Sequence, residues 1–128
     1  MKESFELKAV FNASPTEIYD AWLDGEKHGH MTGGEAHCSD KEGGKFSVSD
    51  GYIWGINLEL HRPDKIVQSW RTSEFETEEE DSRLELQFGE KDGGTELTLI
   101  HSNIPEGQTQ YLQGWVDHYF TPMKEYFG

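Results

Sequence analysis

The chain has 128 residues, with 25 acidic side chains against 11 basic ones and a formal net charge of −14. This length suffices for one hydrophobic core, so we expect residues 1–128 to form a single domain. The charge repels phosphate backbones and anionic headgroups, which argues against nucleic acid and membrane surfaces as partners. Four Trp, five Tyr and seven Phe offset a low apolar fraction of 34%. We therefore expect an aromatic-rich core.

The single cysteine, Cys38, excludes a disulfide within the chain and favours a reducing compartment. The N-terminus has no basic stretch followed by an apolar run. No segment approaches the roughly 20 apolar residues that a membrane-spanning helix needs. The sequence therefore predicts a cytoplasmic protein.

The first part of the chain predicts a strand followed by two short helices. Apolar and polar residues alternate over residues 4–11, which is the period of a half-buried strand. Ser14 and Glu17 match a capping box with a proline between them, so a helix is expected over residues 15–23. A second short helix is expected over residues 26–31, before two adjacent glycines favour a break.

Turn signals divide the middle of the chain into segments with strand-like patterns. Asp50-Gly51 and Asp92-Gly93-Gly94 supply the positive φ values that tight hairpin turns need. Sequential antiparallel pairing is the simplest topology for such a series. The expected strands cover residues 35–39, 44–49, 52–62, 65–73, 82–90 and 95–103.

The last segment changes from a strand period to a helical one. Its apolar residues form one wide stripe over residues 108–127, which predicts a long helix packed on the sheet. Pro122 cannot donate a hydrogen bond to the His118 carbonyl, so a kink is expected near residues 117–120. The complete order predicts an α+β fold with the long helix across one sheet face.

Short strings along nearly the whole chain carry a resemblance to a known family. They are SPTEIY at 14–19, GGKF at 43–46 with the following Asp50-Gly51, PDKIVQSWR at 63–71, GTELTL at 94–99, Ile104-Pro105, and Gly114-Trp115 leading to Tyr119-Phe120. Together with the element order, they resemble the activator of heat-shock-protein-90 ATPase family, in its C-terminal-domain-like branch. That branch belongs to the SRPBCC, or START and birch-pollen-allergen-like, superfamily.

The resemblance implies a helix-grip fold. Such a fold has an antiparallel curved sheet of about six or seven strands, two short helices after the first strand, and a long C-terminal helix across the sheet. Helix-grip proteins commonly enclose a pocket between the last helix and the concave sheet. The shared strings are turns and core aromatics, so they imply a fold more than a reaction.

The leading functional hypothesis is a non-enzymatic domain that holds a small apolar molecule, such as a lipid, sterol or aromatic metabolite, between helix and sheet. The candidate lining residues are Phe46, Trp54, Trp70, His101, Trp115 and Tyr119. Trp and Phe would supply apolar contact, while His101 or Tyr119 would orient a polar group, with Gln68 and the Tyr52 hydroxyl as further polar groups. The alternative to a pocket is a fully packed core. In that case His101 would be a buried imidazole that is hydrogen-bonded to a backbone or side-chain partner.

Two other functions remain open. A chaperone-associated protein-interaction module would use its acidic surface to bind a basic partner. The acidic run at residues 78–81 is one such surface, although a solvated loop explains it more simply. An enzyme of the polyketide-cyclase or hydrolase kind would need a perturbed histidine or carboxylate in the pocket, and His101 is the candidate for that role.

No catalytic residue, cofactor or metal site is predicted. The sequence shows no nucleophile paired with a base and no separated pair of carboxylates. His28, His30, His37 and Cys38 are the densest group of metal-binding side chains, but their spacing is unlike that of a structural zinc site. Surface histidines near a loop are the expected explanation.

Overall fold

A computed structural model describes residues 2–128 of the chain. The strands in this part form one antiparallel sheet in the order β1-β6-β5-β4-β3-β2. From β2 to β6 each strand pairs with the next one along the chain, as the turn signals predict, and β1 pairs with β6. The strands are β1 Glu3–Phe11, β2 Lys45–Val48, β3 Ile53–His61, β4 Lys65–Thr72, β5 Ser82–Lys91 and β6 Gly94–Ile104.

Two helices, α1 Pro15–Leu23 and α2 Gly25–Thr32, connect β1 to the rest of the sheet. The capping box at the start of α1 is confirmed, because the Ser14 side chain accepts the Glu17 N–H at 3.2 Å and the Glu17 carboxylate accepts the Ser14 N–H at 3.4 Å. One 3₁₀ turn, η1 Ser49–Gly51, joins β2 to β3.

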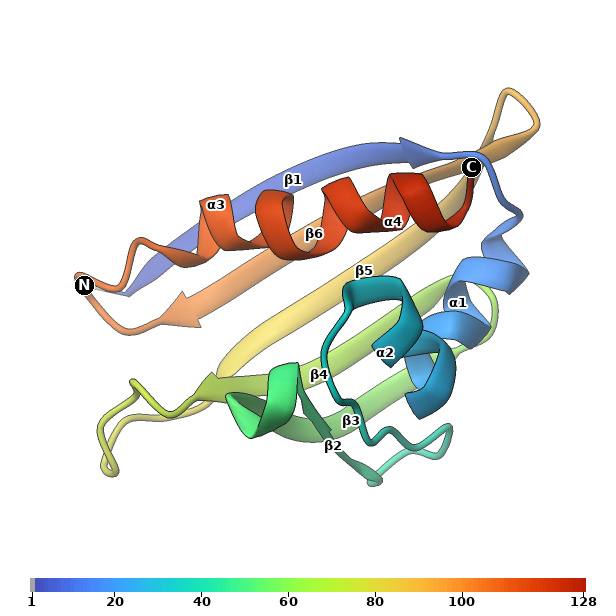
Figure 1. Cartoon of the computed structure of the whole chain (residues 1–128). Helices are drawn as coiled ribbons and strands as arrows, with labels where there is room; N and C mark the ends of the chain where they lie inside the picture. The colour runs from blue at the N-terminus through green and yellow to red at the C-terminus, as the bar shows by residue number, and fades with distance from the viewer. Residues whose placement is uncertain (1) are drawn as a thin grey trace.

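The C-terminal helix consists of α3 Tyr111–Trp115, the π-helical turn η2 Val116–Phe120 and α4 Thr121–Tyr126. Figure 1 shows the three pieces as one continuous helix along β1 and β6. At the end of η2 the Thr121 N–H donates to the Val116 carbonyl, five residues earlier. Because Pro122 cannot continue the α-helical hydrogen bonds, the helix changes register just before it. The irregularity predicted from Pro122 is therefore a π-turn.

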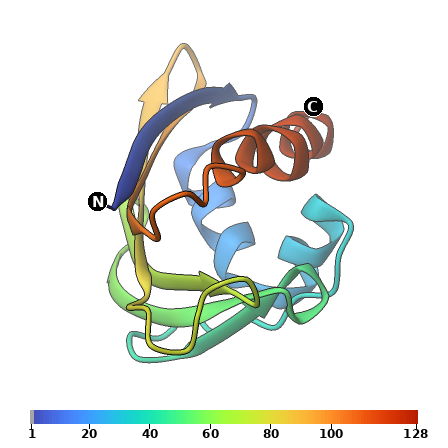
Figure 2. The ribbon, with the colours of Figure 1, turned by 90° about the vertical axis from the view of Figure 1, so that its left-hand side faces the viewer.

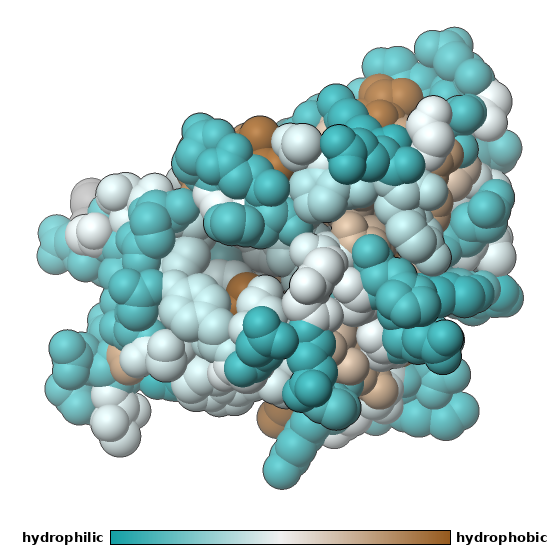
Figure 3. Space-filling view, viewed as in Figure 1, coloured by the Kyte–Doolittle hydropathy of each residue, from teal (hydrophilic) through white to brown (hydrophobic). Residues whose placement is uncertain are grey.

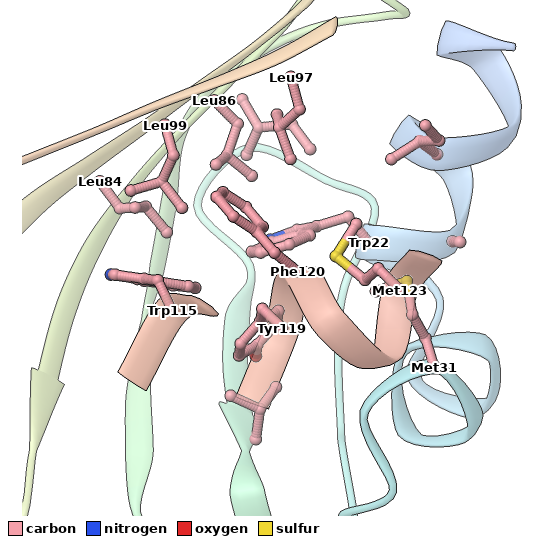
Figure 4. Packing of buried hydrophobic residues seen from close by; sticks show 14 of the residues in the cluster. Trp22, Met31, Leu84, Leu86, Leu97, Leu99, Trp115, Tyr119, Phe120 and Met123 are labelled. Carbon is pink, nitrogen blue, oxygen red and sulfur yellow. The ribbon is translucent and has the colours of Figure 1, made fainter. Parts of the chain in front are cut away.

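The sheet curves around this helix, and α1 and α2 lie on the same concave side (Figure 2). Leucines of β5 and β6 project from the sheet towards the helix side chains Trp115, Phe120 and Met123 (Figure 4). These leucines, Leu84, Leu86, Leu97 and Leu99, are buried, and each contributes roughly 1.5–3 kcal/mol by leaving water. The arrangement is the α+β architecture that the element order predicts and the helix-grip fold that the resemblance implies.

Two expectations about the sheet are wrong. Residues 35–39 are not a strand, since pairing is limited to a bridge between His37 and Ser47. Beyond the bridge, the side-chain amide of buried Asn57 in β3 donates to the carbonyls of Ser39 and Lys41, at 2.8 Å and 3.0 Å, so side-chain bonds take the place of strand pairing there.

The second wrong expectation concerns Trp54, whose expected place in the pocket requires it to lie on the inner face of β3. Trp54 and Ile56 point outwards, and Gly55 points towards the core. A Cβ at Gly55 would fall on the Ser69 carbonyl oxygen and lie 2.7 Å from Phe46 Cε1. Only glycine fits the inner face there, and the alternation of the strand then turns Trp54 and Ile56 to the outside.

Within residues 2–128, no helix combines the length and apolar character that crossing a bilayer requires.

Candidate functional site

A cavity of about 330 Å³ opens between the C-terminal helix and the segment from η1 into β3. Figure 3 shows the face of the molecule with the hollow beside the helix. The volume falls at the lower end of the range for small-molecule sites. The lining residues are Ser49, Tyr52, Ile53, Trp70, Tyr111, Gly114, Trp115, His118 and Tyr119.

One face of the helix forms the upper wall. Tyr111, Gly114, Trp115 and His118 are spaced by i, i+3, i+4 and i+7, so they lie side by side. A Cβ built at Gly114 would have no atom within 4 Å. The missing side chain therefore leaves free space where the helix would otherwise fill it.

The opposite wall depends on the turn η1. Ser49 and Asp50 have positive φ values of 53° and 58°, and the Asp50 carboxylate accepts the Glu35 N–H at 2.8 Å. This turn presents Tyr52 and Ile53 to the helix. Trp70 of β4 completes the lining, and its ring meets that of Tyr111 edge-on, with 5.0 Å between centroids.

The hydroxyl group of the lining residue Tyr111 belongs to a ring of hydrogen bonds at one end of the cavity. The Glu74 N–H donates to Thr72 Oγ1 at 3.1 Å, and Thr72 Oγ1 lies 2.8 Å from the Tyr111 hydroxyl. Tyr111 donates to Gln108 Oε1 at 2.6 Å, and Gln108 Nε2 donates to the Glu74 carbonyl at 3.1 Å. Because Tyr111 uses its proton for Gln108, Thr72 must be the donor to Tyr111.

The Tyr52 hydroxyl donates to the Glu74 carboxylate at the same end. Burial raises the pKa of Tyr52, and the carboxylate of Glu74 raises it further. The pKa of Tyr111 is also raised, again chiefly by burial. Both phenols are therefore neutral at physiological pH, and the charge at this end is the carboxylate.

On the other side of Tyr119 the interior is closed. The gap there measures only about 10 Å³, room for at most about one water. His28 Nδ1 lies 2.8 Å from the Trp22 carbonyl, and His28 Nε2 lies 2.7 Å from the Tyr119 hydroxyl. A carbonyl can only accept, so Nδ1 carries the proton and Tyr119 donates to Nε2.

Burial lowers the pKa of His28 to about 4. This histidine is thus a neutral interior group, and the expectation of a surface residue is wrong for it. The reason is that α2 folds back onto α1 and brings the His28 ring against Trp22, with 5.1 Å between ring centroids. Nothing in the local sequence marks this tertiary contact.

His101 is on the inner face of β6, as its alternation with Leu97 and Leu99 predicts, and it is fully buried. Trp115 Nε1–H donates to His101 Nδ1 at 3.0 Å. The proton is therefore on Nε2, which donates to Ser82 Oγ at 2.9 Å. Burial lowers the pKa of His101 to about 3. With both nitrogens bonded, His101 orients Trp115 and does not line the cavity.

Of the six lining residues proposed from sequence, the structure brings Trp70, Trp115 and Tyr119 together at the cavity. Phe46 lies beside the small closed gap instead. Trp54 is 39% exposed on the outer face of the sheet, so its assignment to the cavity is wrong. Sequence reasoning missed the lining residues Ser49, Ile53, Tyr111, Gly114 and His118.

Among residues 2–128, no three His, Cys, Asp or Glu side chains are grouped to hold a metal ion. His37 is at the surface and lies 3.2 Å from a Glu35 carboxylate oxygen. Burial raises the pKa of the Cys38 thiol to about 11, so the thiolate is scarce at neutral pH. These residues do not form one site.

Comparison with known proteins gives the same family from sequence and from structure. Residues 12–128 match the family described as Activator of Hsp90 ATPase homolog 1-like protein. The human Activator of 90 kDa heat shock protein ATPase homolog 1 is 32% identical over 123 residues, which cover 95% of this chain and 36% of that protein. The Dictyostelium discoideum homolog is 30% identical over 128 residues, which cover 98% of this chain and 33% of that protein. The chain thus spans about a third of the length of these relatives.

The solved structures agree. An HSP90 activator from Plasmodium falciparum matches with a TM-score of 0.81 and 28% identity, covering 92% of this chain and 90% of that one. The Aha1 dimer from Colwellia psychrerythraea also has a TM-score of 0.81, with 98% and 96% covered, but its 13% identity supports the fold alone. This chain belongs to the Activator of Hsp90 ATPase homolog 1-like family, as its sequence resemblance predicts.

Proposed function

We propose that this domain is a non-enzymatic, chaperone-associated interaction module whose partner is a 90 kDa heat shock protein. The observation that carries the proposal is the match to Hsp90 activators along almost the whole chain, at 30–32% identity. In this proposal the domain acts by binding that protein and not by a reaction of its own.

The acidic loop between β4 and β5 is the proposed contact surface. Six carboxylates lie within eight residues, namely Glu74, Glu76, Glu78, Glu79, Glu80 and Asp81. Arg71 holds the loop in place by donating to the carbonyls of Glu76 and Glu79, at 2.9 Å and 3.1 Å, and to Asp81 at 2.7 Å. An ordered array of exposed carboxylates suits a basic surface on the partner.

The test is binding of the fluorescently labelled domain to purified Hsp90, followed by anisotropy at about 50 mM and about 300 mM salt. We expect association at low salt that weakens about tenfold at high salt, because exposed charges carry it. The Hsp90 ATPase rate in the same samples shows whether binding changes turnover.

Two matched triple variants locate the contact. E76Q/E78Q/E80Q removes three charges from the loop, and E6Q/E90Q/E125Q removes three exposed charges elsewhere. We expect the loop variant to bind at least threefold more weakly than the control variant. Absence of binding at low salt, or equal loss in both variants, would contradict the proposal.

The cavity supports a second function, the binding of a small molecule with a largely apolar body. Its volume of about 330 Å³ and its aromatic lining carry this proposal. A calorimetric screen of apolar and aromatic compounds tests it. Binding should be blocked by G114L, because the added side chain would enter the cavity. Unchanged binding in that variant would place the compound elsewhere.

A further inference from the structure

Two lining tyrosines connect the cavity to acceptor groups just outside its lining. The exposed Glu74 carboxylate accepts a hydrogen bond from the hydroxyl of the lining residue Tyr52. A carboxylate has about four acceptor positions, so one bond from Tyr52 leaves others for a ligand. Tyr111 already donates its proton to Gln108. This end of the cavity therefore offers oxygen lone pairs and negative charge.

The walls of the cavity are aromatic faces set at different angles. Trp70 and Trp115 are inclined by 40° with 5.7 Å between their centroids, and Trp115 and Tyr119 by 55° with 4.8 Å. At these separations the rings pack directly against one another, so a ligand would lie against the parts of the rings that line the cavity and not between them. The faces of Trp and Tyr carry a negative quadrupole, which attracts an organic cation more than a neutral group of the same shape.

The charges near the cavity also favour a cation over a neutral ligand. Asp50 is next in sequence to the lining residue Ser49, Glu74 accepts a hydrogen bond from the lining residue Tyr52, and the acidic loop continues beyond Glu74. Among the described lining residues none is Lys or Arg. Arg71 is engaged with Asp81 at 2.7 Å. These carboxylates and the net charge of −14 favour the approach of a cation over that of an anion.

We propose that the cavity takes an organic cation, in which an ammonium group is joined to an apolar or aromatic body. The ammonium would lie near Tyr52 and the Glu74 carboxylate, and the apolar body against Trp70 and Trp115. This inference depends on the second proposed function, binding of a small molecule in the cavity. Beyond that function, the inference specifies that the ligand is positively charged and that the rings and the Glu74 carboxylate select for the charge.

The experiment compares two probes of the same shape by isothermal calorimetry, phenyltrimethylammonium and its uncharged isostere tert-butylbenzene. We expect the cation to bind about tenfold or more tightly than the isostere, because ring faces and a carboxylate both favour the charge. E74Q keeps an acceptor for Tyr52 but removes the charge. It should weaken the cation about threefold to fivefold and leave tert-butylbenzene unchanged.

E78Q is the matched control, since it removes an exposed charge from the same loop away from the cavity lining. It should change neither affinity by more than about a factor of 1.5. If tert-butylbenzene binds as tightly as the cation, the charge preference is wrong while small-molecule binding stands. If neither probe binds, both proposals about the cavity are wrong, and the chaperone proposal is unaffected.

Discussion

The two ends of the space beneath the C-terminal helix have similar aromatic residues but opposite packing. Towards α4, Phe120 and Met123 fill the space against the leucines of β5 and β6 (Figure 4). Towards α3, Trp70 and Trp115 border a cavity of about 330 Å³. The contrast shows that aromatic content alone does not make a cavity. A missing side chain at Gly114 and the turn η1 on the opposite wall create it.

The largest expected difference between the ends is in the cost of removing an aliphatic side chain. L99A at the packed end should lower the free energy of unfolding by about 2–5 kcal/mol, because a new cavity forms among fully packed neighbours. I53A at the open end should cost less than about 2 kcal/mol, since one side of Ile53 already faces free space. Urea denaturation measures both. Equal losses would mean that the open end is packed in solution.

The two buried histidines should make the protein sensitive to mild acid. Burial holds the folded pKa values of His28 and His101 at about 4 and about 3, below the ordinary 6.5. The unfolded chain therefore binds more protons below pH 6.5, and stability is lost as the pH falls from there towards 4. By pH 5.5 we expect a loss on the order of 1 kcal/mol for each histidine.

Urea denaturation at several pH values between about 7.5 and 5.5 checks this slope. H28Q or H101Q should remove about half of it, and the exposed control H30Q should leave it unchanged. His101 lies behind the cavity wall, whereas His28 lies at the closed end. If H28Q and H101Q reduce the pH dependence of stability equally, water in the cavity does not reach His101. A flat profile in the parent protein would contradict the buried neutral state of both rings.

The hydroxyl groups of two tyrosines distinguish the ends on a smaller scale. Y119F leaves the buried Nε2 of His28 without its donor, which should cost about 1–3 kcal/mol. Y111F removes the acceptor of buried Thr72 and the donor to Gln108. A water in the cavity can take the place of the lost hydroxyl and half-buried Gln108 can turn to solvent, so about 0.5–1.5 kcal/mol is expected. Thermal and urea unfolding of both variants give the comparison. A larger loss of stability in Y111F than in Y119F would mean that the interior is closed around Tyr111 and open around Tyr119, which contradicts the structure.

The smallest effect is a gain at Gly114. G114A should stabilise the protein by up to about 1 kcal/mol, because alanine favours the helix and its Cβ meets no atom. G55A is the contrasting control, since its Cβ would strike the Ser69 carbonyl of β4 and should destabilise the sheet clearly. A loss of stability in G114A would mean that this part of the helix does not border free space.

The elements that local patterns determine were predictable. The capping box sets the start of α1, and alternation places His101 inside, as the structure confirms. The face of β3 was not predictable from its own residues. The close approach of Ser69 and Phe46 to Gly55 decides it, and that contact involves two other strands.

Only part of the site was predictable, again because contacts between distant segments decide the rest. Trp70 and Trp115 follow from periodicity and bulk, whereas His28 comes to Tyr119 across 91 residues of sequence. Helical spacing contains a usable signal at Tyr111, Gly114 and His118, which lie on the face of Trp115. Sequence patterns are recognised chiefly from large apolar residues. A cavity depends equally on small residues, which leave space that a larger side chain would fill.

The most direct test of an open, cation-binding end is a ¹H–¹⁵N NMR titration of the tryptophan indole N–H signals with phenyltrimethylammonium. Trp70 and Trp115 line the cavity, whereas Trp54 on the outer face of the sheet is an internal control. The predicted result is that the signals of Trp70 and Trp115 shift in a saturable manner, that of Trp54 stays in place, and G114L abolishes the shifts. Saturable shifts of Trp54 alone, or no shift in any indole signal, would contradict the account.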